Sequence, residues 1–137
     1  MKKITLLITA VVSSITMFSQ APRRVVVEDF TGTWCGYCPR GKTAIESCIA
    51  SYPTAIGMEV HNGDTYANSY SNAIISGIYP SGFPSGAIDR YAFGGSSAFF
   101  DTNLWKSKTS TRLNTTSPVA VSFTSTYNAS TKALSVT

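Results

Sequence analysis

The sequence has a single histidine, His61, which limits the metal and cofactor chemistry that it can support. The three cysteines are Cys35, Cys38 and Cys48, so a zinc site of Cys₃His composition would need all three together with His61. Cys48 lies about three helical turns beyond the pair, which argues against convergence of the four side chains. Covalent haem attachment requires a histidine where the sequence has Pro39. We therefore expect neither a metal nor another cofactor.

Charged residues are scarce, at 13% of the chain against 43% for hydrophobic residues. This composition predicts a globular fold with a packed core and excludes a disordered, highly charged protein. The formal net charge of +4 includes Lys2 and Lys3, and the other basic residues are scattered along the chain. Because nucleic-acid-binding proteins carry clustered basic residues, we expect no nucleic-acid partner.

The N-terminal apolar run, Ile4 to Phe18, is too short to span a bilayer comfortably and follows the basic pair Lys2-Lys3. This arrangement is typical of a secretory signal peptide. We predict that residues 1–20 are such a peptide, with cleavage after Ser19 or after Ala21 as alternatives. The mature chain is then expected outside the cytoplasm, having been secreted across the inner membrane.

Patterns of strand and helix alternate in the next part of the chain. The β-branched run Arg24–Phe30 predicts a buried strand. Apolar residues at helical spacing (Ala44, Ile45, Cys48, Ile49 and Tyr52) predict a helix that begins after Cys38 and stops before Pro53. A second strand over Thr54–Val60 and a helix over Tyr66–Gly77 follow. This order predicts an α/β fold with parallel strands joined by right-handed crossovers.

After a loop over residues 79–86, the pattern predicts a strand over Ala87–Tyr91 and a last helix over Ala98–Leu113. The expected core positions of that helix are Phe100, Leu104, Trp105 and Leu113. Together, these strands and helices predict one domain over residues 23–113.

The last part of the chain changes in character. Residues 114–118 have the composition of a linker, and Val119, Val121 and Phe123 then alternate with small polar residues. Residues 133–137 have the pattern of a return strand. Because an isolated two-stranded hairpin is only marginally stable, we expect residues 119–137 to be the first strands of a truncated all-β module.

The motif Cys35-Gly36-Tyr37-Cys38 lies between the first predicted strand and the first predicted helix. The start of a helix favours the thiolate, because unsatisfied N–H groups and the helix dipole stabilise negative charge there. A thiolate is the attacking species in thiol–disulfide exchange. We predict that Cys35 attacks and that Cys38 resolves the mixed disulfide. A static bridge remains the alternative, although so small a loop contributes little chain-entropy stabilisation.

The segment V-E-D-F-T-G-T-W-C-G-Y-C-P resembles the active-site segment of the thioredoxin superfamily, over about Arg24–Leu113. The resemblance implies a central mixed sheet flanked by helices. It also implies that Cys35 is the nucleophile, Cys38 the buried resolving thiol, Pro84 a cis-proline facing the disulfide and Asp29 a buried acid. We expect substrate contacts from Trp34, Tyr37 and Phe83.

Asp29 has two interpretations. A desolvated acid near the end of the first strand has a raised pKa and can accept the proton of the resolving thiol. The alternative is that Glu28 or Asp29 faces solvent at the end of a strand. Gly-Tyr between the cysteines differs from the Gly-Pro of thioredoxin and the Pro-Tyr of glutaredoxin, so neither redox potential can be transferred to this chain.

Other candidate residues have structural explanations. Cys48 is expected to be a buried core thiol, or to pair with a cysteine in the missing C-terminal part. His61 is expected to form loop hydrogen bonds, because no acid, nucleophile or second histidine is placed beside it at a recognisable spacing. Tyr66, Tyr70 and Tyr79 are expected to pack in the core or in loops rather than to line a peptide groove.

A narrower resemblance rests on three segments: R-R-V-V-V-E-D-F-T-G-T-W-C-G-Y-C-P-R-G, H-N-G-D-T-Y-A-N-S-Y-S-N-A-I and G-F-P-S-G-A-I-D-R. They are similar to the outer membrane protein twenty-eight family of Bacteroidetes. That resemblance implies an envelope or surface location, in the periplasm or at the outer membrane, and a β-rich C-terminal part. The partners expected are protein thiols or disulfides and an unidentified redox partner. A non-enzymatic surface protein with a static Cys35–Cys38 bridge is the alternative function.

Overall fold

The computed structural model describes residues 21–137, so the predicted signal peptide lies outside the described residues. The described chain divides into a larger unit, Arg23–Thr115, and a smaller one formed by residues 21–22 and Thr116–Thr137. In the described part, no helix has the length and apolar character needed to cross a membrane.

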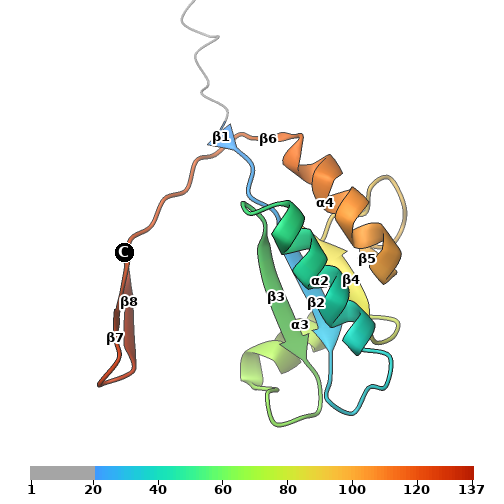
Figure 1. Cartoon of the computed structure of the whole chain (residues 1–137), viewed down its shortest axis with the longest axis horizontal. Helices are drawn as coiled ribbons and strands as arrows, with labels where there is room; N and C mark the ends of the chain where they lie inside the picture. The colour runs from blue at the N-terminus through green and yellow to red at the C-terminus, as the bar shows by residue number, and fades with distance from the viewer. Residues whose placement is uncertain (1–20) are drawn as a thin grey trace, which may run out of the picture. The chain divides into compact units, whose positions relative to one another are not determined.

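The larger unit is a mixed α/β structure built around a four-stranded sheet in the order β3-β2-β4-β5 (Figure 1). Its elements are β2 (Val26–Thr31), α2 (Pro39–Ser51), β3 (Ile56–His61), α3 (Ser69–Ile78), β4 (Ser85–Ile88), β5 (Phe99–Phe100), a short 3₁₀ helix (Thr102–Leu104) and α4 (Trp105–Leu113). Helices α2 and α4 cover one face of the sheet and α3 covers the other. The predicted α/β class with a mixed sheet flanked by helices is confirmed.

The sheet is only partly parallel. β2 pairs with β3 in parallel, as predicted, but β4 is antiparallel to β2, and β5 is antiparallel to β4. The central strand therefore has a neighbour of each kind. Asp29 of β2 lies between Glu59 of β3 and Gly86 of β4 in the register.

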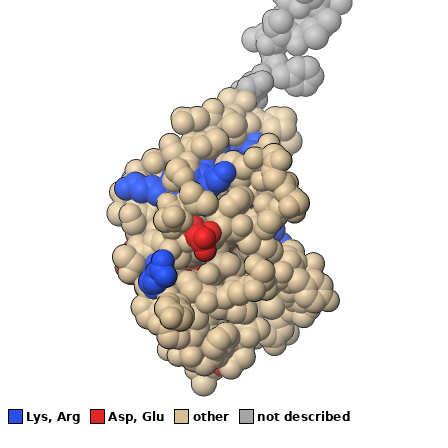
Figure 2. Space-filling view, turned by 90° about the vertical axis from the view of Figure 1, so that its right-hand side faces the viewer, with Lys and Arg blue, Asp and Glu red and all other residues tan. Residues whose placement is uncertain are grey.

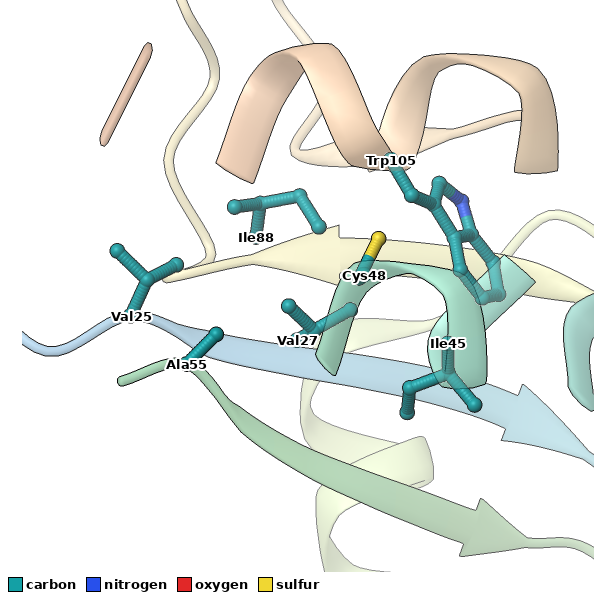
Figure 3. Packing of buried hydrophobic residues seen from close by; sticks show 7 residues of the cluster. All are labelled: Val25, Val27, Ile45, Cys48, Ala55, Ile88 and Trp105. Atoms are coloured by element: carbon teal, nitrogen blue, oxygen red, sulfur yellow. The ribbon is translucent and has the colours of Figure 1, made fainter. Parts of the chain in front are cut away.

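The main core lies between the sheet and the pair α2 and α4 (Figure 3). Its buried members are Val25, Val27, Ile45, Cys48, Ala55, Ile88 and Trp105. Ile45 and Cys48 are buried as the helical spacing predicts, but Ile49 of the same stripe is 38% exposed. Ile49 lies over Gly57 of β3, which is an edge strand of the sheet, so this side chain stays partly open to solvent.

The last α-helix begins at Trp105 rather than at Ala98; a short 3₁₀ helix precedes it, and the prediction of a helix was wrong for residues 98–101. Phe99 and Phe100 instead pair with β4 as a short edge strand. Trp105 fixes this arrangement, because its Nε1 donates a hydrogen bond of 2.8 Å to the carbonyl of Phe100. Trp105 is fully buried, whereas the predicted core residue Leu104 is 40% exposed.

Two other boundaries shift for local reasons. β4 ends at Ile88 rather than at Tyr91, because Asp89 and Arg90 adopt positive φ angles of 51° and 49°. Helix α3 begins at Ser69 rather than at Tyr66, because Asn68 caps it: the Asn68 side chain accepts hydrogen bonds from the backbone N–H groups of residues 70 and 71.

The smaller unit contains two short antiparallel pairs: β1 (Ala21–Pro22) with β6 (Thr116–Ser117), and the hairpin β7 (Ser125–Asn128) with β8 (Ala133–Val136). The strand predicted over residues 119–123 was misplaced, because the hairpin begins at Ser125. The hairpin side chains are exposed on both faces. That these residues open a larger β module stays a prediction.

Charge is sparse on the surface as well as in the composition. On the face drawn in Figure 2, most of the surface is uncharged and the basic side chains do not form one continuous patch.

Candidate active site around the Cys35–Cys38 pair

Cys35 and Cys38 form a disulfide in the loop between β2 and α2, with Cα atoms 5.4 Å apart. The loop is tightly turned: the Cys35 N–H donates to the carbonyl of Gly32, and the Cys38 N–H donates to that of Cys35. Cys38 is the N-cap residue of α2 and Pro39 is its first residue, where a missing N–H is tolerated. Cys38 is only 5% exposed, whereas Cys35 is partly accessible. An incoming thiolate therefore meets Cys35 first.

Asp29 is a buried carboxyl group in β2, on the face that α2 covers. It is 1% exposed, and neither carboxyl oxygen has a hydrogen-bond partner among residues 21–137. Burial, reinforced by the charge of Glu59, raises the pKa of Asp29 to about 7, against the smaller opposing effects of His61 and Lys42. Asp29 can therefore both hold and release a proton near neutral pH. The solvent-facing alternative is wrong for both acids, because Glu28 is buried too, in a bidentate pair with Arg90.

Gly41 explains how the Asp29 carboxyl fits against the helix. A Cβ atom on Gly41 would lie 2.6 Å and 2.7 Å from the two carboxyl oxygens of Asp29. The carboxyl thus packs on the backbone of α2, three residues after Cys38. Gly41 was not predicted as a site residue; a glycine near the start of a helix after the cysteine pair was the available signal.

We expect Gly41→Ala to lower the free energy of unfolding by about 1–3 kcal/mol, since the added methyl group collides with a buried carboxyl that has little room to move. Gly77→Ala in α3 is the matched control: nothing lies within 4 Å of its added Cβ. It should raise stability by up to about 1 kcal/mol through helix propensity. Urea unfolding of both variants checks the pair, and a Gly41→Ala protein as stable as wild type contradicts the proposed packing.

The segment before the disulfide is tied to the loop that follows β3. The Thr33 N–H donates to Asp64 Oδ2 over 2.8 Å, and Trp34 Nε1 donates to the carbonyl of Asn62 over 2.6 Å. Asp64 also accepts hydrogen bonds from the N–H groups of Tyr66 and Ala67. These contacts fix the position of the site loop on the sheet.

The expectation that no acid lies beside His61 was wrong. His61 Nδ1 is 2.7 Å from Asp64 Oδ2, and His61 Nε2 is 3.6 Å from Glu59 Oε2. Burial acts to raise the pKa of Asp64, but hydrogen bonds from His61 and from backbone N–H groups outweigh it and hold this pKa below its usual range. Acids two positions before and three after His61 were the signal that sequence reasoning overlooked.

The aromatic side chains expected to contact substrate are those of Trp34, Tyr37 and Phe83. The rings of Trp34 and Phe83 meet edge to face with centroids 5.4 Å apart, and the Phe83–Pro84 peptide bond is cis. Trp34 is 56% exposed and Tyr37 is 71% exposed. An aromatic surface open to solvent therefore borders the disulfide loop, and its contact with substrate stays a prediction.

Three other tyrosines do not pack in the core. Tyr66, Tyr70 and Tyr79 are 68%, 80% and 79% exposed. Tyr66 keeps one ring contact, with His61, at a centroid distance of 5.1 Å. The core alternative was therefore wrong for all three, whereas the ring contact of Tyr66 agrees with the loop packing that was the other expectation.

Cys48 is a buried free thiol in the main core, apart from the disulfide (Figure 3). Burial raises its pKa, although a hydrogen bond with Thr109 acts in the opposite direction. Such a thiol is chemically quiet. Within residues 21–137, no group of three or more His, Cys, Asp or Glu side chains is arranged to hold a metal ion.

Comparison with known proteins identifies a shared fold. The larger unit defines the class, a mixed α/β domain with a disulfide between its central strand and the helix that follows. The structure is similar to that of HBP35 of Porphyromonas gingivalis, a Bacteroidetes protein, with a TM-score of 0.55 and 24% sequence identity. The match covers 69% of this chain and 34% of HBP35, so the chain spans about a third of that protein. No family model matches the chain, and no curated protein matches it.

Proposed function

We propose that this chain is a thioredoxin-like thiol–disulfide oxidoreductase that works outside the cytoplasm through Cys35 and Cys38. One observation carries the proposal: an accessible Cys35 is bridged to a buried Cys38, and an unpartnered buried carboxyl, Asp29, packs on the first turn of the same helix. A bridge that served only to fix the loop would not need an unsatisfied acid behind it, because an unpaired buried carboxyl destabilises the fold.

The order of elements supports the thioredoxin-like interpretation. A parallel β2-α2-β3 unit is followed by α3, an antiparallel β4-β5 pair and α4, with the cysteine pair at the start of α2. The disulfide loop follows the carboxyl end of β2, where ligands of open α/β sheets usually bind.

The reaction starts from the bridged state. A substrate thiolate attacks Cys35 Sγ, the Cys35–Cys38 bond breaks, and Cys38 leaves as a thiolate that takes the proton of Asp29. A second substrate thiolate then attacks the mixed disulfide and releases Cys35 as a thiolate. The substrate dithiol is oxidised to a disulfide by two electrons, and the cysteine pair is reduced by the same two. The same steps in reverse reduce a substrate disulfide, with Asp29 accepting the proton.

Partners and location extend the proposal. The substrate is a protein thiol or disulfide, and a second thiol or disulfide protein returns the cysteine pair to its starting state. The signal-like N-terminus favours the periplasm, the outer membrane or the cell surface.

The test is the reduction potential of the Cys35–Cys38 pair in a series of glutathione buffers, with reduction of a protein disulfide by dithiothreitol as the activity assay. We expect a potential between those of thioredoxin and the strongly oxidising exchange proteins, about −270 to −120 mV, and measurable turnover. A potential well below about −300 mV without turnover would instead establish a static bridge on a non-enzymatic scaffold.

A further inference from the structure

Glu59 is the acidic neighbour of Asp29 in the sheet. The parallel register of β2 and β3 places the two residues side by side, on strands that lie about 4.8 Å apart, with both side chains on the face that α2 covers. They differ in exposure: the side chain of Glu59 is 31% exposed, whereas Asp29 is 1% exposed. Because β3 is an edge strand, Glu59 is the carboxyl of this pair that reaches solvent.

Two basic side chains hold the Glu59 carboxylate. Lys42 Nζ of α2 lies 2.9 Å from Glu59 Oε1, and His61 Nε2 lies 3.6 Å from Glu59 Oε2. The other ring nitrogen of His61 is held by Asp64, 2.7 Å away. These contacts fix the Glu59 carboxylate beside Asp29.

The charged groups that face Asp29 come from two elements. Lys42 projects from α2, and Glu59 and His61 project from β3. On the other side, the register partner of Asp29 in β4 is Gly86, which has no side chain, and the bridged cysteines are uncharged. Burial and Glu59 oppose the ionised form of Asp29, while Lys42 and His61 favour it. Glu59 is the only acid among these neighbours.

We infer that Glu59 is a positioning residue for the exchange reaction: fixed by Lys42 and His61 beside Asp29, its carboxylate keeps a proton on the Asp29 carboxyl, ready to serve the Cys38 thiolate. The inference rests on the proposed function, because the proton of Asp29 matters to the reaction only if Cys38 is a leaving group. The proposal gives Glu59 of β3, a residue outside the cysteine motif, a role in the reaction.

The direct test is the titration of Asp29 in the oxidised protein, followed by carboxyl carbon NMR after labelling of aspartate. The chain has four aspartates (Asp29, Asp64, Asp89 and Asp101), and the resonance lost in Asp29→Asn identifies the buried one. We expect Glu59→Gln to move the titration midpoint of Asp29 down by about one pH unit, because a like charge is removed and Lys42 is freed.

Glu46→Gln is the matched control. It makes the same chemical change at the other acid paired with Lys42, whose carboxylate is 3.5 Å from Lys42 Nζ on the solvent side of α2. Glu46 is not among the charges that act on Asp29. We expect its replacement to leave the Asp29 midpoint within about 0.2 pH units of wild type, since exposed charges are screened.

A kinetic measurement separates the two proposals. If the wild-type protein exchanges disulfides, the pH midpoint of the exchange rate should move down in Glu59→Gln by the same amount as the NMR midpoint of Asp29. In Glu46→Gln the pH midpoint of the exchange rate should stay in place. An unchanged Asp29 midpoint in Glu59→Gln, or equal shifts in both variants, overturns the role of Glu59 while leaving the exchange function intact. If wild type shows no exchange at any pH, the proposed function fails, and the role of Glu59 in the reaction fails with it even where NMR detects the electrostatic shift.

Discussion

Cys35→Ser is expected to lower the rate of disulfide exchange by about a thousandfold or more, because a serine hydroxyl cannot form the mixed disulfide. Cys38→Ser should behave differently. It keeps the accessible Cys35 thiol but lacks the buried group that resolves the mixed disulfide, so it should accumulate a covalent complex with substrate. Stopped-flow kinetics measures the first effect, and non-reducing electrophoresis followed by mass spectrometry detects the second.

The third cysteine supplies the control. Cys48 lies in the main core beside Trp105 and outside the site loop, so Cys48→Ala should keep the wild-type exchange rate. The same change should lower the free energy of unfolding by about 1–2 kcal/mol, because a small cavity forms in the core. Two results would contradict the assignment of Cys35 as the attacking thiol. One is exchange by Cys35→Ser at the wild-type rate, and the other is loss of exchange in Cys48→Ala at a temperature where that variant is folded.

The elements with strong periodic patterns were predictable from sequence. The β-branched run that becomes β2 and the apolar spacing of α2 gave the central strand and the helix that carry the cysteine pair. Both elements bury a continuous apolar surface, so pattern and structure agree. The order strand, helix, strand, helix also predicted the parallel β2–β3 pair.

The errors occurred where tertiary contacts override local pattern. Phe100 has helical spacing relative to Leu104, yet Phe99 and Phe100 extend as a strand because β4 offers an open edge and Trp105 hydrogen-bonds to the Phe100 carbonyl. Likewise, no local rule states that Asp89 and Arg90 leave the strand with positive φ. Asp89 does so while accepting a hydrogen bond from the Val26 N–H, a partner 63 residues away.

The candidate site divides in the same way. Cys35 and Cys38 could be proposed from the motif and its position after a strand, and Asp29 from the resemblance to the thioredoxin superfamily. The neighbours that set the environment of Asp29, namely Gly41, Lys42 and Glu59, come from two separate elements and carry no motif. Their role depends on sheet register and on how closely α2 approaches β2, and neither can be obtained from spacing in the sequence.

Asp29→Asn is expected to stabilise the oxidised protein at alkaline pH and to slow the exchange reaction. The pKa of Asp29 is raised in the fold, from 3.8 to about 7, so the folded state binds this proton more tightly than the unfolded chain does. The associated stability is fully present below about pH 4 and is lost as the pH rises to about 7. Above that, the buried carboxylate lowers the free energy of unfolding by about 2–4 kcal/mol, and an amide avoids this loss.

Urea unfolding of oxidised wild type and Asp29→Asn between pH 4 and pH 8.5 measures this difference. The two proteins should be similar near pH 4 and should diverge as the pH rises, with the variant more stable at pH 8.5. At the same time, the variant cannot exchange a proton with Cys38, so its exchange rate at pH 7 should fall by about 10²-fold. Parallel stability curves would show that Asp29 is not a buried titrating acid. A stabilised variant with the wild-type exchange rate would show that the acid is buried but takes no part in the chemistry, which separates the electrostatic property of the fold from its use in the reaction.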